Sequence, residues 1–384
     1  MLVQTPSQHV FSTMPLLAPA SLGAPLAEVD TPALIVDLQA LEHNLEAMKG
    51  ALRGSGVRLR AHAKTHKCPE IARLQVKSGA VGICVQKVSE AEIMVEAGLR
   101  DVFVSNQVVG AEKAKRLVQL GRRARIAACV DDARNVAELS AAADAAGIVI
   151  DVLVEVNVGQ DRCGVAPGEP ALALVQAVKS ARFLRFAGLH AYHGSAQHLR
   201  SVAERRAAIE QAAAKARRTK ELLASYHIGC ETITGGGTGT FLFEAASDVY
   251  NEVQAGSYVF MDADYGRNAW DGFPPFRQSL FVLTTVMSAA IPGRLVVDAG
   301  LKSVAIDSGL PVVHRRSGLE YTKASDEHGV INVADQREAP KLGEKLQLVP
   351  GHCDPTVNLH DWIVGVRADR VEALWPIAAR GAVF

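Results

Sequence analysis

Short apolar runs alternate along the first two thirds of the chain with stretches in which apolar residues recur at helical spacing. Eight of the runs are expected to be strands, and they fall at 57–63, 81–85, 102–105, 126–130, 151–158, 186–192, 231–234 and 252–260. The helical patterns between them include 89–96, 111–120, 135–145 and 203–223. Such alternation predicts parallel βαβ units, and eight units within about 210 residues are typical of an α/β protein with a (β/α)8 (TIM) barrel. An open doubly wound sheet is the alternative.

The pattern differs on both sides of this region. The apolar run 33–37 predicts a strand, and Leu41, Leu45, Met48 and Leu52 then mark one face of a helix with Asp37 as its N-cap. After about residue 265, strand-like segments without long helical patterns predict a mostly-β domain, and they fall at 278–287, 294–298, 345–349, 362–367 and 370–377. Because the barrel already has eight strands, 33–37 is a candidate to pair with that domain. We therefore expect an N-terminal arm (1–28), a barrel (29–268) and a C-terminal β domain (269–384).

Composition narrows the class of protein. Lys and Arg together number 41, as do Asp and Glu, so the formal net charge is zero. That argues against nucleic-acid or polybasic membrane binding, both of which need a standing positive field. No apolar run reaches the roughly 18 residues of a membrane span. The first basic residue is Lys49, which fits neither a secretory nor a transit signal, and the six cysteines form no CxxC pair, so a reduced, cytoplasmic protein is expected.

The first barrel strand brings a lysine toward its end. Period-2 alternation places Arg58, Arg60, His62 and Lys64 on one face, with Lys64 ending the strand near the C-terminal mouth, where barrel active sites lie. A partly desolvated lysine beside other cations would have a lowered pKa and could form a Schiff base. A solvated surface lysine is the alternative.

Two further strand ends carry candidate chemistry. The seventh barrel strand runs into the glycine-rich stretch 234–240, whose backbone N–H groups could hold a phosphate, although a plain flexible turn would look the same. The sixth ends in a stretch that carries three histidines, His190, His193 and His198. A cluster at a mouth position is a stronger indication of function than a single histidine.

In the C-terminal domain, the segment 350–356 offers His352 and Asp354. If this segment is extended, residues two apart point the same way, so an imidazole and a carboxylate could share one metal ion. Cys353 would then point away.

Together these features resemble the fold-type III pyridoxal phosphate (PLP) enzymes, whose type member is alanine racemase, and most closely the D-threonine aldolase and 3-hydroxy-D-aspartate aldolase family. The resemblance runs from about residue 29 to 381. The matching stretches are 61–71 (AHAKTHKCPEI), 86–91 (QKVSEA), 162–165 (RCGV), 191–195 (AYHGS), 232–239 (TITGGGTG), 255–258 (AGSY), 261–266 (MDADYG), 326–330 (DEHGV), 351–356 (GHCDPT) and 358–361 (NLHD).

The resemblance implies roles for matching positions. Lys64 would carry PLP as a Schiff base, Arg162 would contact its phenolic oxygen, and Tyr192 and Tyr265 would lie near the cofactor. The phosphate would be held by Gly235, Gly236, Gly237 and Thr238. Gln254 stands where alanine racemase has an arginine that faces the pyridine nitrogen, which leaves the protonation of that nitrogen open. His352 and Asp354 would be metal ligands, and this hard pair favours Mn²⁺ or Mg²⁺ over Zn²⁺.

The implied reaction is a PLP- and metal-dependent retro-aldol cleavage of D-3-hydroxy-α-amino acids, such as D-threonine to glycine and acetaldehyde. His198 is the candidate base, and the alternative is that it only orients the substrate or a metal-bound water. The alternatives are a 3-hydroxy-D-aspartate aldolase, which yields glycine and glyoxylate, and a D-serine or hydroxyaspartate dehydratase of the same fold. D-Serine dehydratases carry a thiolate at the position of Asp354, which favours the aldolase. The resemblance also implies a homodimer that shares its sites.

Overall fold

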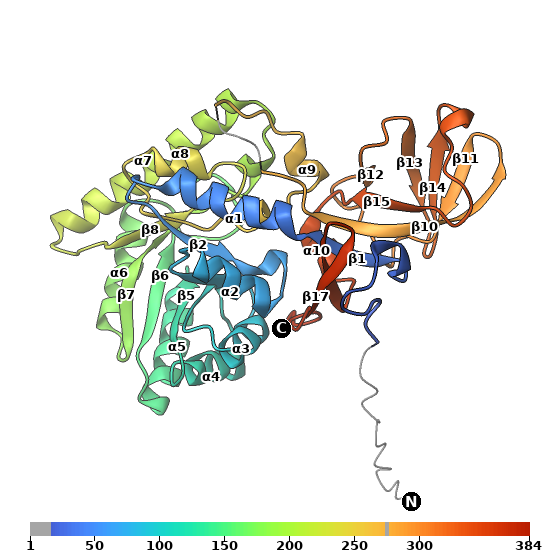
Figure 1. The fold of residues 1–384 in the computed structure, drawn as a ribbon. Helices are drawn as coiled ribbons and strands as arrows, with labels where there is room; N and C mark the ends of the chain where they lie inside the picture. Colours follow the sequence, from blue (N-terminus) through green and yellow to red (C-terminus); the bar gives the residue numbers. More distant parts are fainter. Residues whose placement is uncertain (1–16, 273–275) are drawn as a thin grey trace, which may run out of the picture.

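The computed structural model describes residues 17–272 and 276–384, and it shows an α/β barrel joined to a mostly-β domain (Figure 1). The barrel is closed by eight parallel strands in chain order. They are β2 (Arg58–His62), β3 (Gly82–Val85), β4 (Asp101–Gln107), β5 (Arg125–Val130), β6 (Ile150–Glu155), β7 (Leu184–His190), β8 (Thr232–Gly235) and β9 (Glu252–Val253). The predicted (β/α)8 barrel with a C-terminal β domain is confirmed.

Helices cover the barrel, and their ends follow from local sequence. The longer ones are α1 (Leu38–Leu52), α2 (Pro69–Lys77), α3 (Val88–Glu96), α4 (Ala111–Leu120), α5 (Ala133–Ala146), α6 (Glu169–Ser180) and α7 (Val202–Ser225). Asp37 caps α1 by accepting from the N–H groups of Gln39 and Ala40. Ser201 and Glu204 form a capping box at the start of α7, which satisfies donors that a helix start leaves free. Among the described residues, no helix is both long and apolar enough to cross a membrane.

The C-terminal domain is a nine-stranded sheet that includes a strand from the beginning of the chain. β1 (Ala33–Asp37) pairs antiparallel with β10 and parallel with β16. The other strands are β10 (Leu280–Ile291), β11 (Arg294–Val297), β12 (Val312–Val313), β13 (Leu319–Ala324), β14 (Gly329–Val333), β15 (Lys345–Val349), β16 (Trp362–Arg367) and β17 (Arg370–Pro376). Of the N-terminal arm, 17–28 is described; it bonds to the turn before β17 and includes η1 (Leu26–Glu28).

Several short helical elements lie between the strands, and one of them replaces part of a predicted strand. The eighth barrel strand, expected at 252–260, ends at Val253, and the chain turns at Gly256 into the 3-10 helix η4 (Ser257–Val259). A side chain at Gly256 would meet the His62 carbonyl, so this position sits too close to β2 for anything but glycine. The other short elements are η2 (Ala63–Thr65), η3 (Ser195–His198), α8 (Phe241–Ala245), α9 (Ala263–Gly266), η5 (Gln336–Glu338) and α10 (Cys353–Val357).

Charged side chains from β2, β4 and β9 meet inside the barrel. Arg60 donates to Glu252 at 3.0 Å and to Asp101 at 2.5 Å, and it is 8% exposed. Because each buried charge has an opposite partner, the desolvation cost of this cluster is offset. The same face of β2 presents His62 at the opposite end, so the strand places its chemistry at the C-terminal mouth.

Candidate active site

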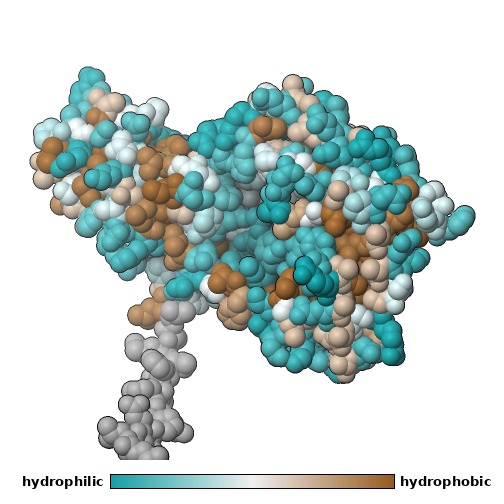
Figure 2. Space-filling model, turned by 180° about the vertical axis from the view of Figure 1, so that it is seen from behind, coloured by the Kyte–Doolittle hydropathy of each residue, from teal (hydrophilic) through white to brown (hydrophobic). Residues whose placement is uncertain are grey.

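A cavity of about 280 Å³ lies at the C-terminal mouth of the barrel. Seen from behind, the surface between the barrel and the β domain is hollowed and mostly hydrophilic (Figure 2). The cavity is lined by residues that follow the barrel strands and by one residue of α9: His62, Lys64, Thr65, Gln86, Ser105, Arg162, His190, Tyr192, Gly237, Thr238, Gln254, Gly256, Ser257 and Tyr265. Seven of the predicted site residues are therefore brought to one cavity.

Lys64 lies in the 3-10 turn η2, two residues beyond the end of β2, rather than on the strand itself. Its Nζ lies 2.5 Å from Oδ2 of Asp354 in the C-terminal domain. Burial alone would lower the pKa of this amine, but Asp354 and Tyr192 more than offset burial, and the pKa lies above its usual range. The expected lowering by neighbouring cations is therefore wrong in this arrangement, because the nearest charge is a carboxylate.

The glycine-rich loop leaves β8 next to this cavity. Gly236 has a φ of +73°, a backbone conformation that glycine adopts without strain. A Cβ at Gly235 would meet the Ala191 carbonyl, and one at Gly237 would meet the Gln197 side chain at 2.6 Å. Gly237 and Thr238 line the cavity, whereas Gly235 and Gly236, which were also predicted to hold the phosphate, are not among its lining residues. The Thr238 hydroxyl is buried without a hydrogen-bond partner, as expected of a group that binds a ligand oxygen.

Arg162, Tyr192 and Gln254 line the rest of the cavity. The Arg162 guanidinium lies 5.8 Å from the centre of the Tyr192 ring. Gln254 donates to Thr234 at 2.9 Å, and its Oε1 lies 3.4 Å from Nε2 of His190. The Gln254 amide is thereby fixed by two neighbours and is itself neutral, unlike the arginine of alanine racemases.

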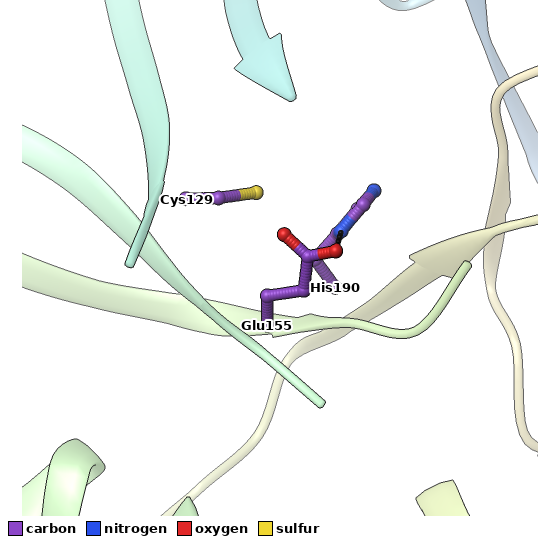
Figure 3. Close-up of side chains that lie close together, drawn as sticks. All are labelled: Cys129, Glu155 and His190. Atoms are coloured by element: carbon purple, nitrogen blue, oxygen red, sulfur yellow. Dashed lines mark ion pairs between the residues drawn. The ribbon is translucent and has the colours of Figure 1, made fainter. Parts of the chain in front are cut away.

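Three side chains from β5, β6 and β7 converge inside the barrel (Figure 3), and one of them, His190, is the residue that contacts Gln254. Cys129, Glu155 and His190 bring one ligand atom each within 4.8 Å of one another, and such residue types bind transition metals. However, Glu155 already accepts from Gln107 at 2.5 Å and faces His190 at 3.5 Å. Burial raises the pKa of the Cys129 thiol well above its usual range, which keeps it protonated. We therefore interpret this group as a polar layer that supports Gln254.

The predicted metal pair lies at the start of α10. His352 is the N-cap of this helix, so the segment is not extended as expected, yet Nε2 of His352 and Oδ2 of Asp354 are 3.9 Å apart. Nδ1 of His352 contacts Oδ2 of Asp262 at 2.8 Å, and Asp262 is fully buried. A carboxylate on the far side of an imidazole fixes the tautomer that leaves Nε2 free for a metal. Cys353 is buried, and its backbone N–H also donates to Asp262.

His198 lies beside the cavity rather than in its wall. It ends η3, its side chain is 49% exposed, and its ring centre lies 6.0 Å from that of Tyr265, which lines the cavity. Nδ1 of His198 contacts Asp264 at 2.5 Å. His193, the third histidine of the predicted cluster, contacts Ser195 instead.

Sequence reasoning missed some of the lining and both supporting carboxylates. The lining residues that the sequence pattern did not indicate are Thr65, Gln86, Ser105, Gly256 and Ser257, whereas His62 and His190 were noted there without a role. His62 had a signal, because it shares the inward face of its strand with Lys64. Asp262 and Asp264 lie within the matched stretch 261–266 but gave no separate signal, since their partners are more than sixty residues away.

Comparisons with known proteins identify the family of this chain. Residues 36–264 match the family described as alanine racemase, N-terminal domain, and residues 279–366 match a serine dehydratase domain. The chain is 53% identical to the D-threonine aldolase of Arthrobacter sp, covering 98% of this chain and 99% of that protein. It is 44% identical to the 3-hydroxy-D-aspartate aldolase of Paracoccus denitrificans (strain Pd 1222), covering 94% and 95%.

A solved structure extends the agreement to three dimensions. The D-threonine aldolase from Filomicrobium marinum is similar with a TM-score of 0.94 and 52% identity, covering 96% of this chain and 100% of that chain. Sequence similarity over nearly full length and a shared two-part fold lead to the same conclusion. This chain belongs to the D-threonine aldolase and 3-hydroxy-D-aspartate aldolase family, whose barrel is of the alanine racemase type.

Proposed function

We propose that the protein cleaves D-3-hydroxy-α-amino acids by a PLP- and divalent-metal-dependent retro-aldol reaction, with D-threonine giving glycine and acetaldehyde. The observation that carries this proposal is the contact between two domains at one cavity. The Lys64 amine, from the barrel, lies 2.5 Å from Asp354, which belongs to the His352–Asp354 pair of the β domain. An amine suited to PLP and a pair suited to a hard cation thus meet at one point.

The residues present fit PLP. Lys64 supplies an amine at the cavity, and the glycine-rich loop supplies a wall without side chains together with the unpartnered Thr238 hydroxyl, as a phosphate requires. Arg162 brings a positive charge to the same cavity, where it would meet the phenolic oxygen of the cofactor. Gln254, held by Thr234 and His190, would face the pyridine nitrogen.

The residues also fit a divalent cation. His352 offers Nε2 because its other nitrogen contacts Asp262, and Asp354 offers a carboxylate. Burial alone would raise the pKa of Asp354, but Lys64 and His352 lower it by more than burial raises it. The net pKa lies below its usual range, so the carboxylate is ionised. One nitrogen and one hard oxygen, completed by water and substrate oxygens, favour Mn²⁺ or Mg²⁺ over Zn²⁺. A cation here would compete with Lys64 for Asp354 and so release the amine.

PLP, the divalent cation and His198 would each contribute a different part of the reaction. When bound, PLP stabilises the electron pair left at the α-carbon, and the cation lowers the pKa of a hydroxyl that it contacts. In this proposal His198 takes the β-hydroxyl proton at Nε2, so the C–O bond becomes a carbonyl while the Cα–Cβ bond breaks. The α-carbon keeps the electron pair and gains a proton, which gives glycine.

The similarity to 3-hydroxy-D-aspartate aldolase keeps a second substrate open, 3-hydroxy-D-aspartate, which would yield glycine and glyoxylate. A dehydratase would instead yield pyruvate or oxaloacetate. D-Serine dehydratases of this fold have a thiolate where this chain has the carboxylate of Asp354. A His/Asp ligand pair suits a hard cation that binds the substrate hydroxyl, and this favours cleavage over dehydration.

The test is a product assay on the purified protein with PLP. D-Threonine, D-phenylserine and D-3-hydroxyaspartate would each be supplied with and without Mn²⁺, and glycine, aldehydes, pyruvate and oxaloacetate would be measured. We expect stoichiometric glycine and aldehyde that depend on the metal. Keto-acid products without glycine would replace the aldolase by a dehydratase, and metal-independent turnover would remove the role of His352 and Asp354.

A homodimer and a cytoplasmic location are also part of the proposal. Large apolar side chains are exposed on the β domain, among them Met287, Ile291, Leu310 and Val312, and apolar residues gather on this part of the surface (Figure 2). A second copy would cover such a surface. Light scattering during size-exclusion chromatography should give twice the 40.9 kDa mass of the chain. All six cysteines are free, as in a reducing compartment.

A further inference from the structure

Asp264 is a buried carboxylate between three basic side chains. It lies in α9 and is 4% exposed. Its Oδ2 contacts Nδ1 of His198 at 2.5 Å, and its Oδ1 accepts from Arg200 at 2.5 Å and from Arg267 at 2.7 Å. Burial raises the pKa of Asp264, but these partners lower it to about 2, so the carboxylate is ionised at neutral pH.

The contact decides which nitrogen of His198 can act as a base. An ionised carboxylate only accepts, so Nδ1 of His198 must carry the proton in this contact. In the neutral imidazole, Nε2 then keeps its lone pair and is the atom able to accept a proton. A buried carboxylate fixes the tautomer and orientation of the histidine in Ser-His-Asp triads in the same way.

The two arginines change what Asp264 does to the histidine. A carboxylate that faced His198 alone would favour the charged imidazolium, which cannot accept a proton. Here Arg200 and Arg267 also pair with Asp264, so its negative charge is shared among three partners and does not face His198 alone. Arg200 also donates to the Asp264 carbonyl and to Asn268 at 2.8 and 2.7 Å, which ties the loop after η3 to α9.

The same connections fix His198 relative to the cavity. Asn268 donates to the Gln197 carbonyl, next to His198 in the chain. Tyr265, next to Asp264, lines the cavity and packs near the His198 ring. Asp264 therefore connects the proposed base, His198, to the part of the cavity wall that Tyr265 forms.

We propose that Asp264 is a positioning residue for His198: it holds the proton of Nδ1, leaves Nε2 as the proton acceptor, and is kept in place by Arg200 and Arg267. This rests on the proposed function, in which His198 takes the β-hydroxyl proton. Asp264 itself contacts neither substrate nor cofactor in this account.

The first test is a double-mutant cycle on the PLP- and Mn²⁺-loaded enzyme with D-threonine. H198Q should lower kcat roughly 10²-fold or more, and D264N should lower it roughly 10-fold or more with little change in KM. If Asp264 acts through His198, D264N should cost nothing further in the H198Q background. Effects that multiply in the double variant, or a D264N variant with normal kcat, would overturn the proposal. D335N, at an exposed N-cap that pairs with Arg337, is the matched control and should keep full activity.

The second test does not depend on turnover. The short contact should give a downfield proton resonance, assigned to His198 Nδ1 by ¹⁵N-histidine labelling, that is absent from H198Q and D264N but present in D335N. Absence of the resonance from an active wild-type enzyme would overturn the role of Asp264 alone. A wild-type enzyme that shows the resonance but cleaves no β-hydroxy amino acid would overturn the proposed function, and with it any role of Asp264 in turnover.

Discussion

Glu244 offers a quantitative test of the phosphate loop. It lies in α8 and is 1% exposed, accepts from Thr240 at 2.8 Å, and leaves its other oxygen without a partner. A Cβ at Gly236 would meet this carboxyl at 2.9 Å, so Glu244 lies directly behind the glycine-rich loop. Burial raises its pKa to about 7, against the opposing effect of the Thr240 hydrogen bond.

The sign and size of the effect follow from linkage. The folded pKa of about 7 lies above the ordinary value of 4.5, so folding favours the protonated form. The resulting stabilisation is fully present below pH 4.5 and is lost as the pH rises through about 7. At about 1.4 kcal/mol per unit, the shift corresponds to roughly 3 kcal/mol in the free energy of unfolding.

E244Q removes this titration while keeping an acceptor for Thr240. We expect the wild type to lose up to roughly 3 kcal/mol relative to E244Q between pH 4.5 and pH 8. The assay is urea unfolding of both proteins at several pH values, without PLP, with E210Q as a control at an exposed glutamate of α7. Parallel stability curves for wild type and E244Q would refute the reasoning. Well below pH 7 Glu244 is neutral and adds no negative charge behind a phosphate, so in that range E244Q should also bind PLP as tightly as the wild type does.

Three further predictions concern the cofactor and the metal. K64A should lose both activity and the visible absorbance of bound PLP, because Lys64 is the amine at the cavity; absorbance that survives dialysis would reject it as the anchor. Chelation should suppress cleavage while PLP absorbance persists, and added Mn²⁺ should restore turnover; an enzyme indifferent to a strong chelator would contradict the metal role. D262A should weaken Mn²⁺ binding roughly 10- to 100-fold, because Nδ1 of His352 loses its acceptor. Titration with Mn²⁺ followed by electron paramagnetic resonance measures the affinity. An unchanged affinity would contradict the role of Asp262 in orienting His352.

The sequence predicts most of the barrel, because strand and helix periodicity alternate clearly there. The helix expected at 111–120 is α4 as observed, and the strands at 345–349 and 362–367 are β15 and β16. Prediction failed where the pattern is short or polar. β12 has two residues, and the hairpin of β13 and β14 carries a register shift at Tyr321, so neither shows clean alternation. The eighth barrel strand ends at Val253, and the close approach of Gly256 to β2 just beyond it is a long-range feature that local sequence does not encode.

The candidate site shows the same division. The lysine at a strand end, the glycine-rich loop and the His-Cys-Asp segment are local patterns, so each could be predicted from the sequence. The environment of Lys64 could not, since its neighbour Asp354 is 290 residues away and reverses the expected direction of its pKa. The supporting contacts of Asp262 and Asp264 are likewise long-range: Asp262 meets His352 of the C-terminal domain, and Asp264 meets His198 in the turn after β7.

That junction explains why a strand from the beginning of the chain belongs to the C-terminal sheet. The proposed metal pair can act only if α10 is held at a fixed distance from Lys64. Helix α9 bonds directly to the segment before α10, through Ala263 to Pro350 and Asp264 to Gly351. β1 lies between β10 and β16 and leads straight into α1, so the β domain is joined to the barrel by the chain on both sides. Two connections restrict relative motion of the domains more than one would. Since a displacement of about 1 Å can cost roughly 10²-fold in rate, this arrangement keeps a site built from two domains in working geometry.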